Sequence, residues 1–404
     1  MKTVAIIAEY NPFHNGHLYQ IEKIKECLGT DTAIIAIMSG NYVQRGEIAI
    51  LDKWQRAKIA VECGVDLVLE LPFPYSMASA EFFAKAGVKI ASEVCADILA
   101  FGSESGNTDE LVKIAKNMLS DAYKSKFNEL SADPNYSEIG YPKLVEKAYT
   151  AIFDDELCSL FFKPNNILAL EYIKAIINSK SHLIPFSIKR EGADYSDEKI
   201  GDSPFQSATA LRKALIKNAT SASEYIPNTA FNTISTLLHE GQFPCESQRL
   251  SSAVLTHFRL SDPTLGNEIH DAGGGLYNRL KNKSFEATDI STLIEIAATK
   301  KYTTARIKRA IWYSLLGVTS SDVQKMPEYT QLLATNSVGQ NLLKKLKKID
   351  GITVITKPSS YKSLSPDAVK QKQLSDGADS VFQLSKPVGV PGNASLKSTP
   401  FVKK

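Results

Sequence analysis

Two histidines near the start of the chain have the spacing of a phosphate-binding pair. His14 and His17 lie three residues apart in Asn11-Pro12-Phe13-His14-Asn15-Gly16-His17. A single tight turn can aim both imidazoles at one ligand, and Gly16 leaves room where a phosphate meets the free N–H groups of a helix N-terminus. Two imidazoles over a triphosphate can stabilise charge that develops on the α-phosphoryl group and the leaving oxygen. The competing interpretation is a pair of turn histidines that only caps a helix.

The elements around this pair follow from alternating hydrophobic patterns. Buried strands are predicted at residues 4–8, 32–37, 65–69 and 97–101. Helices are predicted between them, at residues 17–27, 53–63 and 80–91. Continuous apolar strands separated by helices indicate a parallel sheet covered on both faces, and right-handed crossovers give a doubly wound α/β domain. Ligands of such a fold gather at the carboxyl ends of the strands, where the histidine pair lies.

The length of 404 residues predicts two or three domains. We predict a catalytic domain at 1–220, a helical domain at 221–345 and a small C-terminal unit at 346–404. Strands are also expected at 185–190 and 351–356. The tail from about Leu384 is rich in Ser, Pro, Gly and Lys, and this composition predicts loose order.

The composition excludes several classes of protein. Hydrophobic residues make up 43% and charged residues 23%, which is typical of a globular protein. Five widely spaced cysteines without a Cys-x-x-Cys pair argue against a zinc ribbon or a disulfide framework and favour the reducing cytoplasm. No signal peptide and no apolar run long enough to span a membrane is visible, so no membrane association is expected.

A strand followed by His-x-Gly-His and a helix resembles the nucleotidyltransferase superfamily, which includes adenylyl- and cytidylyltransferases and class I aminoacyl-tRNA synthetases. Ser207-Ala208-Thr209-Ala210-Leu211-Arg212 is similar to the Ser-x-Thr-x-x-Arg element of those transferases. There, the hydroxyls and the arginine hold the β- and γ-phosphates. Taken alone, this segment is equally consistent with an ordinary N-capped helix.

A longer series of motifs narrows the resemblance. In chain order they are IIAEYNPFHNGHLYQ, SGNYVQRGE, LELPFPYS, FGSESGN, KPNNILALEYIKA, IKREGADY and SATALR. Together they resemble the bacterial tRNA(Met) cytidine acetate ligase family, densely over residues 1–220 and more weakly to about residue 360. No KMSKS-like motif is visible, so the chain is not expected to be a synthetase.

The resemblance implies a two-step reaction. ATP, carried with Mg²⁺, activates acetate as acetyl-adenylate and releases pyrophosphate. The acetyl group then passes to N4 of the wobble cytidine of elongator tRNA(Met). The implied catalytic residues are His14 and His17, which stabilise the transition state, and Arg190 and Arg212, which face the pyrophosphate.

The resemblance also implies an ATP site that runs along the first motif and continues elsewhere. Its residues are Ile7, Ala8, Glu9, Tyr10, Asn11, Pro12, Phe13, His14, Asn15, Gly16, His17, Leu18, Tyr19, Gln20, Gly102, Asn165 or Asn166, Arg190, Ser207 and Thr209. Which asparagine makes the contact stays open. Gly102 would let adenine approach, or would be a plain turn. No metal site formed by the protein is predicted.

Two further segments are open to alternative interpretations. Residues 39–47 follow the second strand and face the same crevice, so they form either the acyl acceptor pocket or a surface loop. Gly273-Gly274-Gly275 lacks the Gly-Lys-Ser/Thr of a P-loop, so it is interpreted as a hinge.

The stretch 276–316 is unusually basic. Eight lysines and arginines oppose three acidic residues there, whereas the net charge of the whole chain is +3. Tyrosines and a tryptophan interleave with these charges, at Tyr277, Tyr302, Trp312 and Tyr313. This mixture suits phosphate contacts and base stacking on a folded RNA, although a solvated helix face is the common alternative. The predicted tRNA-binding residues are Lys300, Lys301, Arg306, Lys308 and Arg309.

Two rival functions remain at this stage. A small-molecule adenylyltransferase would share the His-x-Gly-His chemistry but would not need the long basic region. A tRNA-binding protein with an inactive nucleotide pocket would not need His14, Gly16, His17 and Arg212, all of which are present.

Overall fold

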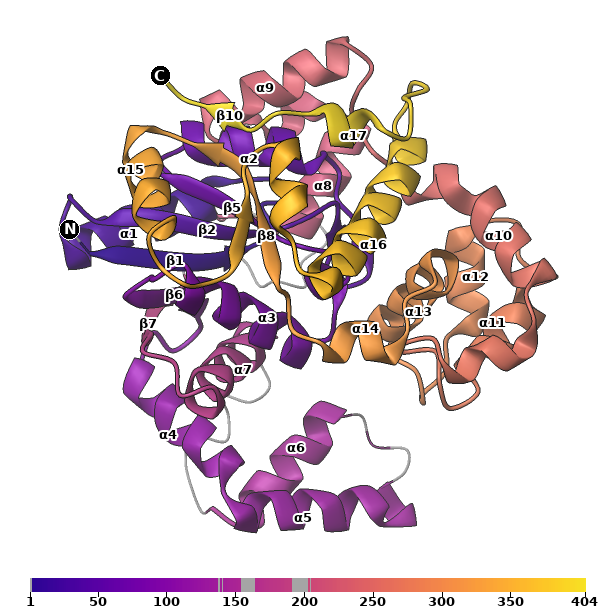
Figure 1. The fold of residues 1–404 in the computed structure, drawn as a ribbon. Coiled ribbons are helices and arrows are strands. Elements are labelled where there is room, and N and C mark those ends of the chain that lie inside the picture. Colours follow the sequence, from indigo (N-terminus) through magenta and orange to yellow (C-terminus); the bar gives the residue numbers. More distant parts are fainter. Residues whose placement is uncertain (1, 137–138, 140, 154–163, 191–202, 204) are drawn as a thin grey trace.

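The computed structural model describes residues 2–136, 139, 141–153, 164–190, 203 and 205–404 (Figure 1). Four of the five cysteines lie in this part as free thiols, and Cys158 lies outside it. No helix in the described ranges is long and apolar enough to cross a membrane.

A mixed, mostly parallel sheet forms the centre of the molecule, with the strand order β10-β8-β5-β2-β1-β6-β7. The strands of this order are β1 (Thr3–Ala8), β2 (Ala33–Ser39), β5 (Leu67–Leu71), β6 (Ile98–Ser103), β7 (Ile184–Lys189), β8 (Tyr329–Thr335) and β10 (Phe401–Val402). The pairs between β5 and β7 are parallel, which confirms the predicted α/β fold. β8 runs antiparallel to β5, and β9 (Thr353–Ile355) pairs with β8.

Side chains of the central strands alternate between two hydrophobic clusters, one on each face of the sheet. Ile35 and Ile37 of β2 pack in one cluster, whereas Ile34 and Met38 pack in the other. This alternation is the period of two of a β-strand, and here both faces are apolar because both are covered.

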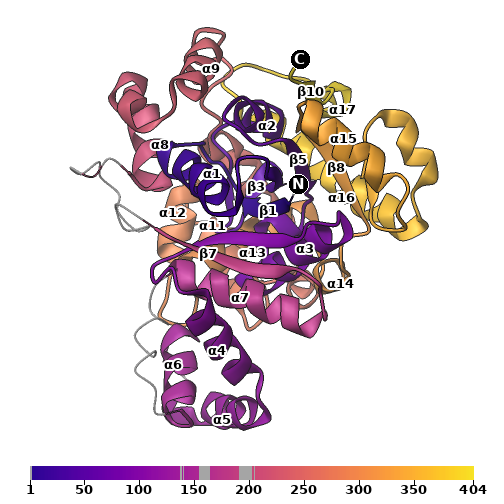
Figure 2. The same cartoon turned by 90° about the vertical axis from the view of Figure 1, so that its left-hand side faces the viewer.

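Helices cover both faces (Figure 2). One cluster includes α3 (Ala80–Glu93), α4 (Thr108–Leu119), α5 (Asp121–Ala132), α6 (Tyr141–Thr150), α7 (Pro164–Asn178) and α15 (Ser337–Leu346). The other includes α1 (Asn15–Leu28), α2 (Lys53–Glu62), α8 (Ala208–Lys217) and α9 (Asn228–His239). The helices α4 to α6 extend away from the sheet in both views.

A helical lobe packs around a third hydrophobic cluster, which it shares with residues of the N-terminal part such as Tyr42 and Phe73 and with Phe382 of the C-terminal part. It contains α10 (Ser251–Leu260), α11 (Leu276–Ser284), α12 (Ile290–Ala297), α13 (Thr304–Leu316) and α14 (Ser320–Gln324). Short 3-10 helices connect the larger elements, at Tyr75–Met77, Pro134–Tyr136, Ala219–Tyr225, Ser247–Leu250, Pro263–Asn267, Pro358–Ser363 and Gln383–Ser385.

The C-terminal part returns to the N-terminal sheet. Its helices are α16 (Pro366–Phe382) and α17 (Ala394–Lys397). The tail, which composition predicts to be loose, is attached at several points: the Lys386 ammonium lies 2.8 Å from an Asp52 carboxylate oxygen, and β10 pairs with β8. The central sheet therefore draws strands from all three predicted domains.

Candidate active site

A cavity of about 470 Å³ opens at the carboxyl ends of β1 and β6. An adjoining hollow of about 70 Å³ shares five of its residues: His14, His17, Gln20, Gly102 and Arg190. The lining residues that the sequence predicts for ATP are Ile7, Ala8, Glu9, Tyr10, Asn11, His14, Gly16, His17, Tyr19, Gln20, Gly102 and Arg190. The histidine motif and the ends of β6 and β7 thus meet around one space.

The two histidines close the first turn of α1 reciprocally. His14 is the N-cap, and its Nδ1 accepts a hydrogen bond from the Gly16 N–H at 3.1 Å. The His14 N–H donates to Nδ1 of His17 at 3.2 Å, and the two rings stack with centroids 3.8 Å apart. Both histidines therefore cap the helix, and this capping occupies only their Nδ1 atoms. The far edge of each ring stays available to the cavity.

Both imidazoles are neutral at pH 7. Burial, with the nearby positive charges of Arg190 and Arg212, lowers the pKa of His14 to about 3. Burial, His14 and Arg190 lower the pKa of His17 well below its ordinary value. A neutral imidazole carries one hydrogen, and Nδ1 accepts in each ring, so the hydrogen lies on Nε2. The site holds two neutral Nε2–H donors side by side.

Arg190 follows β7 and lies over Gly102. A Cβ atom at Gly102 would come 3.1 Å from Cγ of Arg190. The missing side chain at Gly102 therefore makes room for the arginine. Whether it also lets adenine approach stays a prediction. This packing brings the guanidinium to the same space as the histidines.

Arg212 holds the histidine turn to the start of α8. Its guanidinium donates to the Asn11 carbonyl at 2.9 Å and to the Thr209 hydroxyl at 3.2 Å, and pairs with Glu47 at 3.0 Å. Ser207 is the N-cap of α8 and accepts from the Ala210 N–H at 3.0 Å. The hydroxyls of Ser207 and Thr209 thus take part in local contacts.

Several predicted ATP residues do not line the cavity. Phe13 is buried in the core, and Asn15 donates to the Glu224 carbonyl at 2.9 Å. Asn166 is fully buried and accepts from the Glu104 N–H at 3.0 Å, whereas the side chain of Asn165 lies outside the described part of the chain. Pro12, Leu18, Ser207 and Thr209 are not in its wall either, and the same is true of Arg212, which was predicted to be catalytic.

The predicted acceptor segment is a hairpin of β3 (Tyr42–Val43) and β4 (Glu47–Ile48). Its tip residues Gln44 and Arg45 line the cavity, and most of the hairpin is buried, so it is not a simple surface loop. Tyr42 packs against Phe73, which follows β5, and against Trp312 of the helical lobe. The hairpin therefore lies between the sheet and the lobe.

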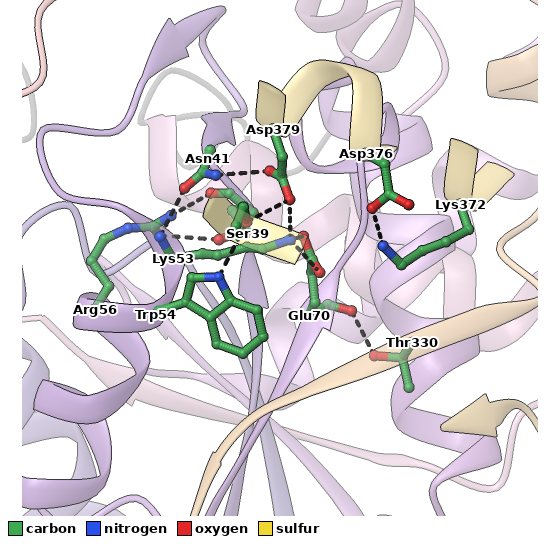
Figure 3. A network of polar contacts seen from close by, with 12 residues as sticks. Ser39, Asn41, Lys53, Trp54, Arg56, Glu70, Thr330, Lys372, Asp376 and Asp379 are labelled. Atoms are coloured by element: carbon green, nitrogen blue, oxygen red, sulfur yellow. Dashed lines mark hydrogen bonds and ion pairs between the residues drawn. The ribbon is translucent and has the colours of Figure 1, made fainter. Parts of the chain in front are cut away.

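A buried polar network includes Asn41, which directly precedes this hairpin (Figure 3). The Lys53 ammonium contacts Glu70 at 2.7 Å and Asp379 of α16 at 2.6 Å, and Asn41 donates to Asp379 at 2.7 Å. Arg56 is completely buried and donates to four backbone carbonyls, those of Glu9, Ser39, Gly40 and Leu51. Sequence reasoning missed this network because its members are far apart along the chain.

The predicted tRNA-binding residues divide into two groups. Lys308 pairs with Glu47 at 2.7 Å, and Arg309 is buried and pairs with Asp271 at 2.5 Å. These two charges are neutralised within the chain. Lys300 and Lys301 are exposed, and Arg306 is half-buried. Thr303 and Ala305 line the catalytic cavity, so this second group lies beside its wall.

The aromatic residues and the glycine run of the basic stretch have structural roles. Tyr277, Tyr302, Trp312 and Tyr313 are buried in the lobe, so the expected base stacking on them is wrong. Arg306 donates to the Gly273 carbonyl at 2.9 Å, and Lys301 donates to that of Gly274 at 2.9 Å. These contacts stabilise the turn in this structure, and the hinge stays a prediction.

Metal-ligating side chains do not gather in the described residues: no group of three or more His, Cys, Asp or Glu there could hold a metal ion.

Comparisons with known proteins agree over most of the chain. The family model described as HIGH Nucleotidyl Transferase matches residues 1–391. A protein named tRNA(Met) cytidine acetate ligase from Caldanaerobacter subterraneus is 36% identical over 379 residues, which cover 91% of this chain and 92% of that protein. A protein of the same name from Acetivibrio thermocellus is 36% identical over 388 residues, 93% of this chain and 92% of its own length. The crystal structure of Thermotoga maritima TmcAL bound with alpha-thio ATP has a TM-score of 0.90 at 27% identity and covers 100% of this chain and 99% of that chain.

Proposed function

The chain belongs to the tRNA(Met) cytidine acetate ligase family of HIGH nucleotidyl transferases, and from this premise we propose that it acetylates elongator tRNA(Met). ATP activates acetate as acetyl-adenylate, and the acetyl group passes to N4 of the wobble cytidine. The observation that carries the proposal is the pair of neutral Nε2–H donors at the cavity. The alpha-thio ATP in the Thermotoga maritima structure supports an ATP site in the same fold.

In the first step, a carboxylate oxygen of acetate attacks the α-phosphorus of ATP and pyrophosphate leaves. The oxygens of the α-phosphoryl group gain negative charge in the transition state. Two fixed N–H donors of His14 and His17 stabilise that charge, and a donor of this kind contributes about 10²–10³ in rate. Arg190, which lines the cavity, supplies positive charge that balances the departing pyrophosphate. Arg212, which pairs with Glu47, acts from outside the wall by holding the histidine turn through the Asn11 carbonyl. Magnesium enters with the ATP phosphates, since the oxygen ligands of Mg²⁺ in such sites come largely from the nucleotide.

In the second step, the cytidine amine attacks the acetyl carbonyl of acetyl-adenylate and AMP leaves. The chain needs no nucleophilic side chain for this route, because the mixed anhydride is itself the acyl donor. The RNA approaches along residues 300–306, whose Thr303 and Ala305 line the cavity. Lys300, Lys301 and Arg306 then meet backbone phosphates, and Lys308 and Arg309 take no part. The free thiols suit a cytoplasmic enzyme.

One incubation tests the proposal. The protein is mixed with Mg²⁺, ATP, labelled acetate and total tRNA, and the nucleosides of the recovered RNA are separated. We expect label in N4-acetylcytidine of elongator tRNA(Met), together with AMP and pyrophosphate. Acetate-dependent exchange of labelled pyrophosphate into ATP reports the first step separately, and a negative exchange result is repeated with tRNA present. AMP transfer to a phosphate ester without acetylated RNA would instead support the small-molecule adenylyltransferase.

A further inference from the structure

The acetyl-transfer step releases a proton. The N4–C bond forms, the bond between the acetyl carbon and the AMP oxygen breaks, and N4 must lose one hydrogen. An exocyclic amine of cytosine is a weak nucleophile, so a base that removes this proton as the bond forms accelerates the step. General bases of this kind contribute about 10²–10⁴ in rate.

The two histidines cannot be this base. The Nδ1 lone pair of each ring accepts a backbone N–H, and each Nε2 already carries a hydrogen. A proton could be accepted only if the N-terminal turn of α1 lost one of these hydrogen bonds. His14 and His17 are therefore fitted to donate and not to accept.

The other titratable residues in the described wall of the cavity are also excluded, with one exception. Arg45 and Arg190 are cations with no acceptor. Burial raises the pKa of Tyr10 and of Tyr172 above its ordinary value, so both phenols stay protonated at neutral pH. The exception is Glu9, which is the carboxylate among these wall residues.

Glu9 directly follows β1 and is held at both its backbone and its side chain. Arg56 donates to the Glu9 carbonyl at 2.6 Å, and the Gln44 N–H donates to Oε1 of Glu9 at 3.0 Å. Within the described part of the chain, the other carboxylate oxygen, Oε2, has no hydrogen-bond partner. Oε2 is also not one of the fully buried polar atoms without a partner, so it is not sealed in the core. The carboxylate is thus fixed through one oxygen and keeps the other for the cavity.

The surroundings of Glu9 raise its affinity for a proton. Burial raises the pKa of Glu9, and the negative charge of Glu47 acts in the same direction. Arg212, the Gln44 hydrogen bond and Arg45 act in the opposite direction. Arg56 and the Tyr172 phenol also face it. Burial prevails, and a carboxylate with a raised pKa is a better base at neutral pH.

We propose that Glu9 is the general base that takes the N4 proton during acetyl transfer. The proposal rests on the proposed function and assigns a residue to its second step. It separates the two halves of the reaction: the histidines serve adenylate formation as donors, and Glu9 serves acyl transfer as the acceptor.

The experiment compares the variants Glu9→Gln and Glu9→Asp with a matched control, Glu22→Gln. Glu22 is an exposed carboxylate of α1. Glu9→Gln keeps an oxygen for the Gln44 N–H but cannot accept a proton. Each variant is assayed for acetate-dependent pyrophosphate exchange and for single-turnover acetyl transfer from enzyme-bound acetyl-adenylate to tRNA, across a range of pH. The wild-type transfer rate should fall as the pH drops through the pKa of Glu9, because only the carboxylate form acts.

We expect Glu9→Gln to lose about 10²–10⁴ in the transfer rate, far more than it loses in the exchange assay, together with the acidic limb of the pH profile. Glu9→Asp should recover part of the transfer rate, and Glu22→Gln should behave as the wild type. Normal transfer by Glu9→Gln overturns the assignment and leaves the proposed function intact. An equal loss in both assays also overturns it, because Glu9 would then serve substrate binding. A wild-type protein that exchanges pyrophosphate but acetylates no RNA would overturn the proposed function itself.

Discussion

At the residue scale, His14 and His17 each have two separate duties. Nδ1 of each ring completes the N-terminal turn of α1. Both rings line the cavity, where we propose that Nε2 donates to the α-phosphoryl group. A substitution can therefore remove one duty and keep the other. Asparagine is among the best N-cap residues, and its short side-chain oxygen can accept the Gly16 N–H without reaching the cavity.

We expect His14→Asn to lower the rate of pyrophosphate exchange by about 10²–10³, the scale for losing one transition-state donor. The thermal unfolding midpoint should stay near that of the wild type because the cap is kept. His14→Ala should lose the same activity and, in addition, about 0.5–2 kcal/mol of stability because the cap is lost. Calorimetry and acetate-dependent pyrophosphate exchange on the two variants measure this split. A His14→Asn variant with wild-type exchange would show that the ring takes no part in the reaction.

The low pKa of His14 predicts how stability depends on pH. In the unfolded chain a histidine titrates near its ordinary pKa of about 6.5, whereas in the folded protein His14 titrates at about 3. Between these values the unfolded state binds the extra proton, so stability is complete above about pH 6.5 and falls as the pH decreases. The loss at pH 5 is about 2 kcal/mol for this one group. Urea unfolding at several pH values should show a shallower decrease for His14→Asn, and equal slopes would contradict the neutral histidine.

At the scale of elements, the β3–β4 hairpin depends on α16, a helix more than three hundred residues further along the chain. Lys53 lies between Glu70 and Asp379, and all three side chains are buried. The same Asp379 accepts from Asn41, which precedes β3. The network therefore connects the C-terminal helix to the hairpin that carries Gln44 and Arg45 to the cavity.

We expect Lys53→Met to lower the free energy of unfolding by about 3–5 kcal/mol, because it leaves two buried carboxylates without their cation. Lys325→Met is the control, since it breaks an ion pair with Asp367 whose side chains are 58% and 45% exposed, and such pairs contribute about 0–1 kcal/mol. Denaturant titration measures both. Equal, small losses of unfolding free energy would mean that Glu70 and Asp379 do not remain as uncompensated buried charges when Lys53 is replaced.

Local patterns account for what the sequence could predict at this scale. The strands β1, β2, β5 and β6 are mostly apolar runs, so their type and order follow from neighbours in the chain. β8 was not predicted, because its place beside β5 depends on a contact between distant segments. The histidine pair, Gly102 and Arg190 were found through motifs. The Lys53 network was not, since isolated charged residues usually lie on surfaces and nothing local reveals their partners.

At the scale of the whole molecule, charge counts along the sequence differ from the charge that the surface presents. The basic stretch predicted five tRNA-binding residues, but two of them form ion pairs within the chain. Lys308 pairs with Glu47, which is far away in the sequence, and Arg309 pairs with Asp271, which lies in another loop. A carbonyl contact, unlike an ion pair, leaves the positive charge in place. Lys301 and Arg306 therefore still carry their charge beside the cavity, although both bind backbone oxygens.

The last prediction concerns how the RNA reaches the cavity. Lys300 and Lys301 are exposed next to Thr303, which lines the cavity. Lys344 and Lys345 are also exposed, and they lie on α15, which follows the end of β8. The end of β8 pairs with the start of β5, so α15 begins at the end of the sheet opposite to the carboxyl ends that form the cavity. We expect Lys300→Glu with Lys301→Glu to weaken tRNA binding and to reduce the slope of log affinity against log salt by about one unit per lost phosphate contact.

The control, Lys344→Glu with Lys345→Glu, changes the net charge by the same amount and should leave both quantities near the wild type. Acetate-dependent pyrophosphate exchange should survive in both variants, because neither pair contacts the histidine turn. Equal losses of affinity in the two variants would mean that the RNA responds to total charge and not to this surface. Loss of exchange in the first variant alone would mean that residues 300–301 support the cavity wall, because Lys301 holds the Gly274 carbonyl at 2.9 Å.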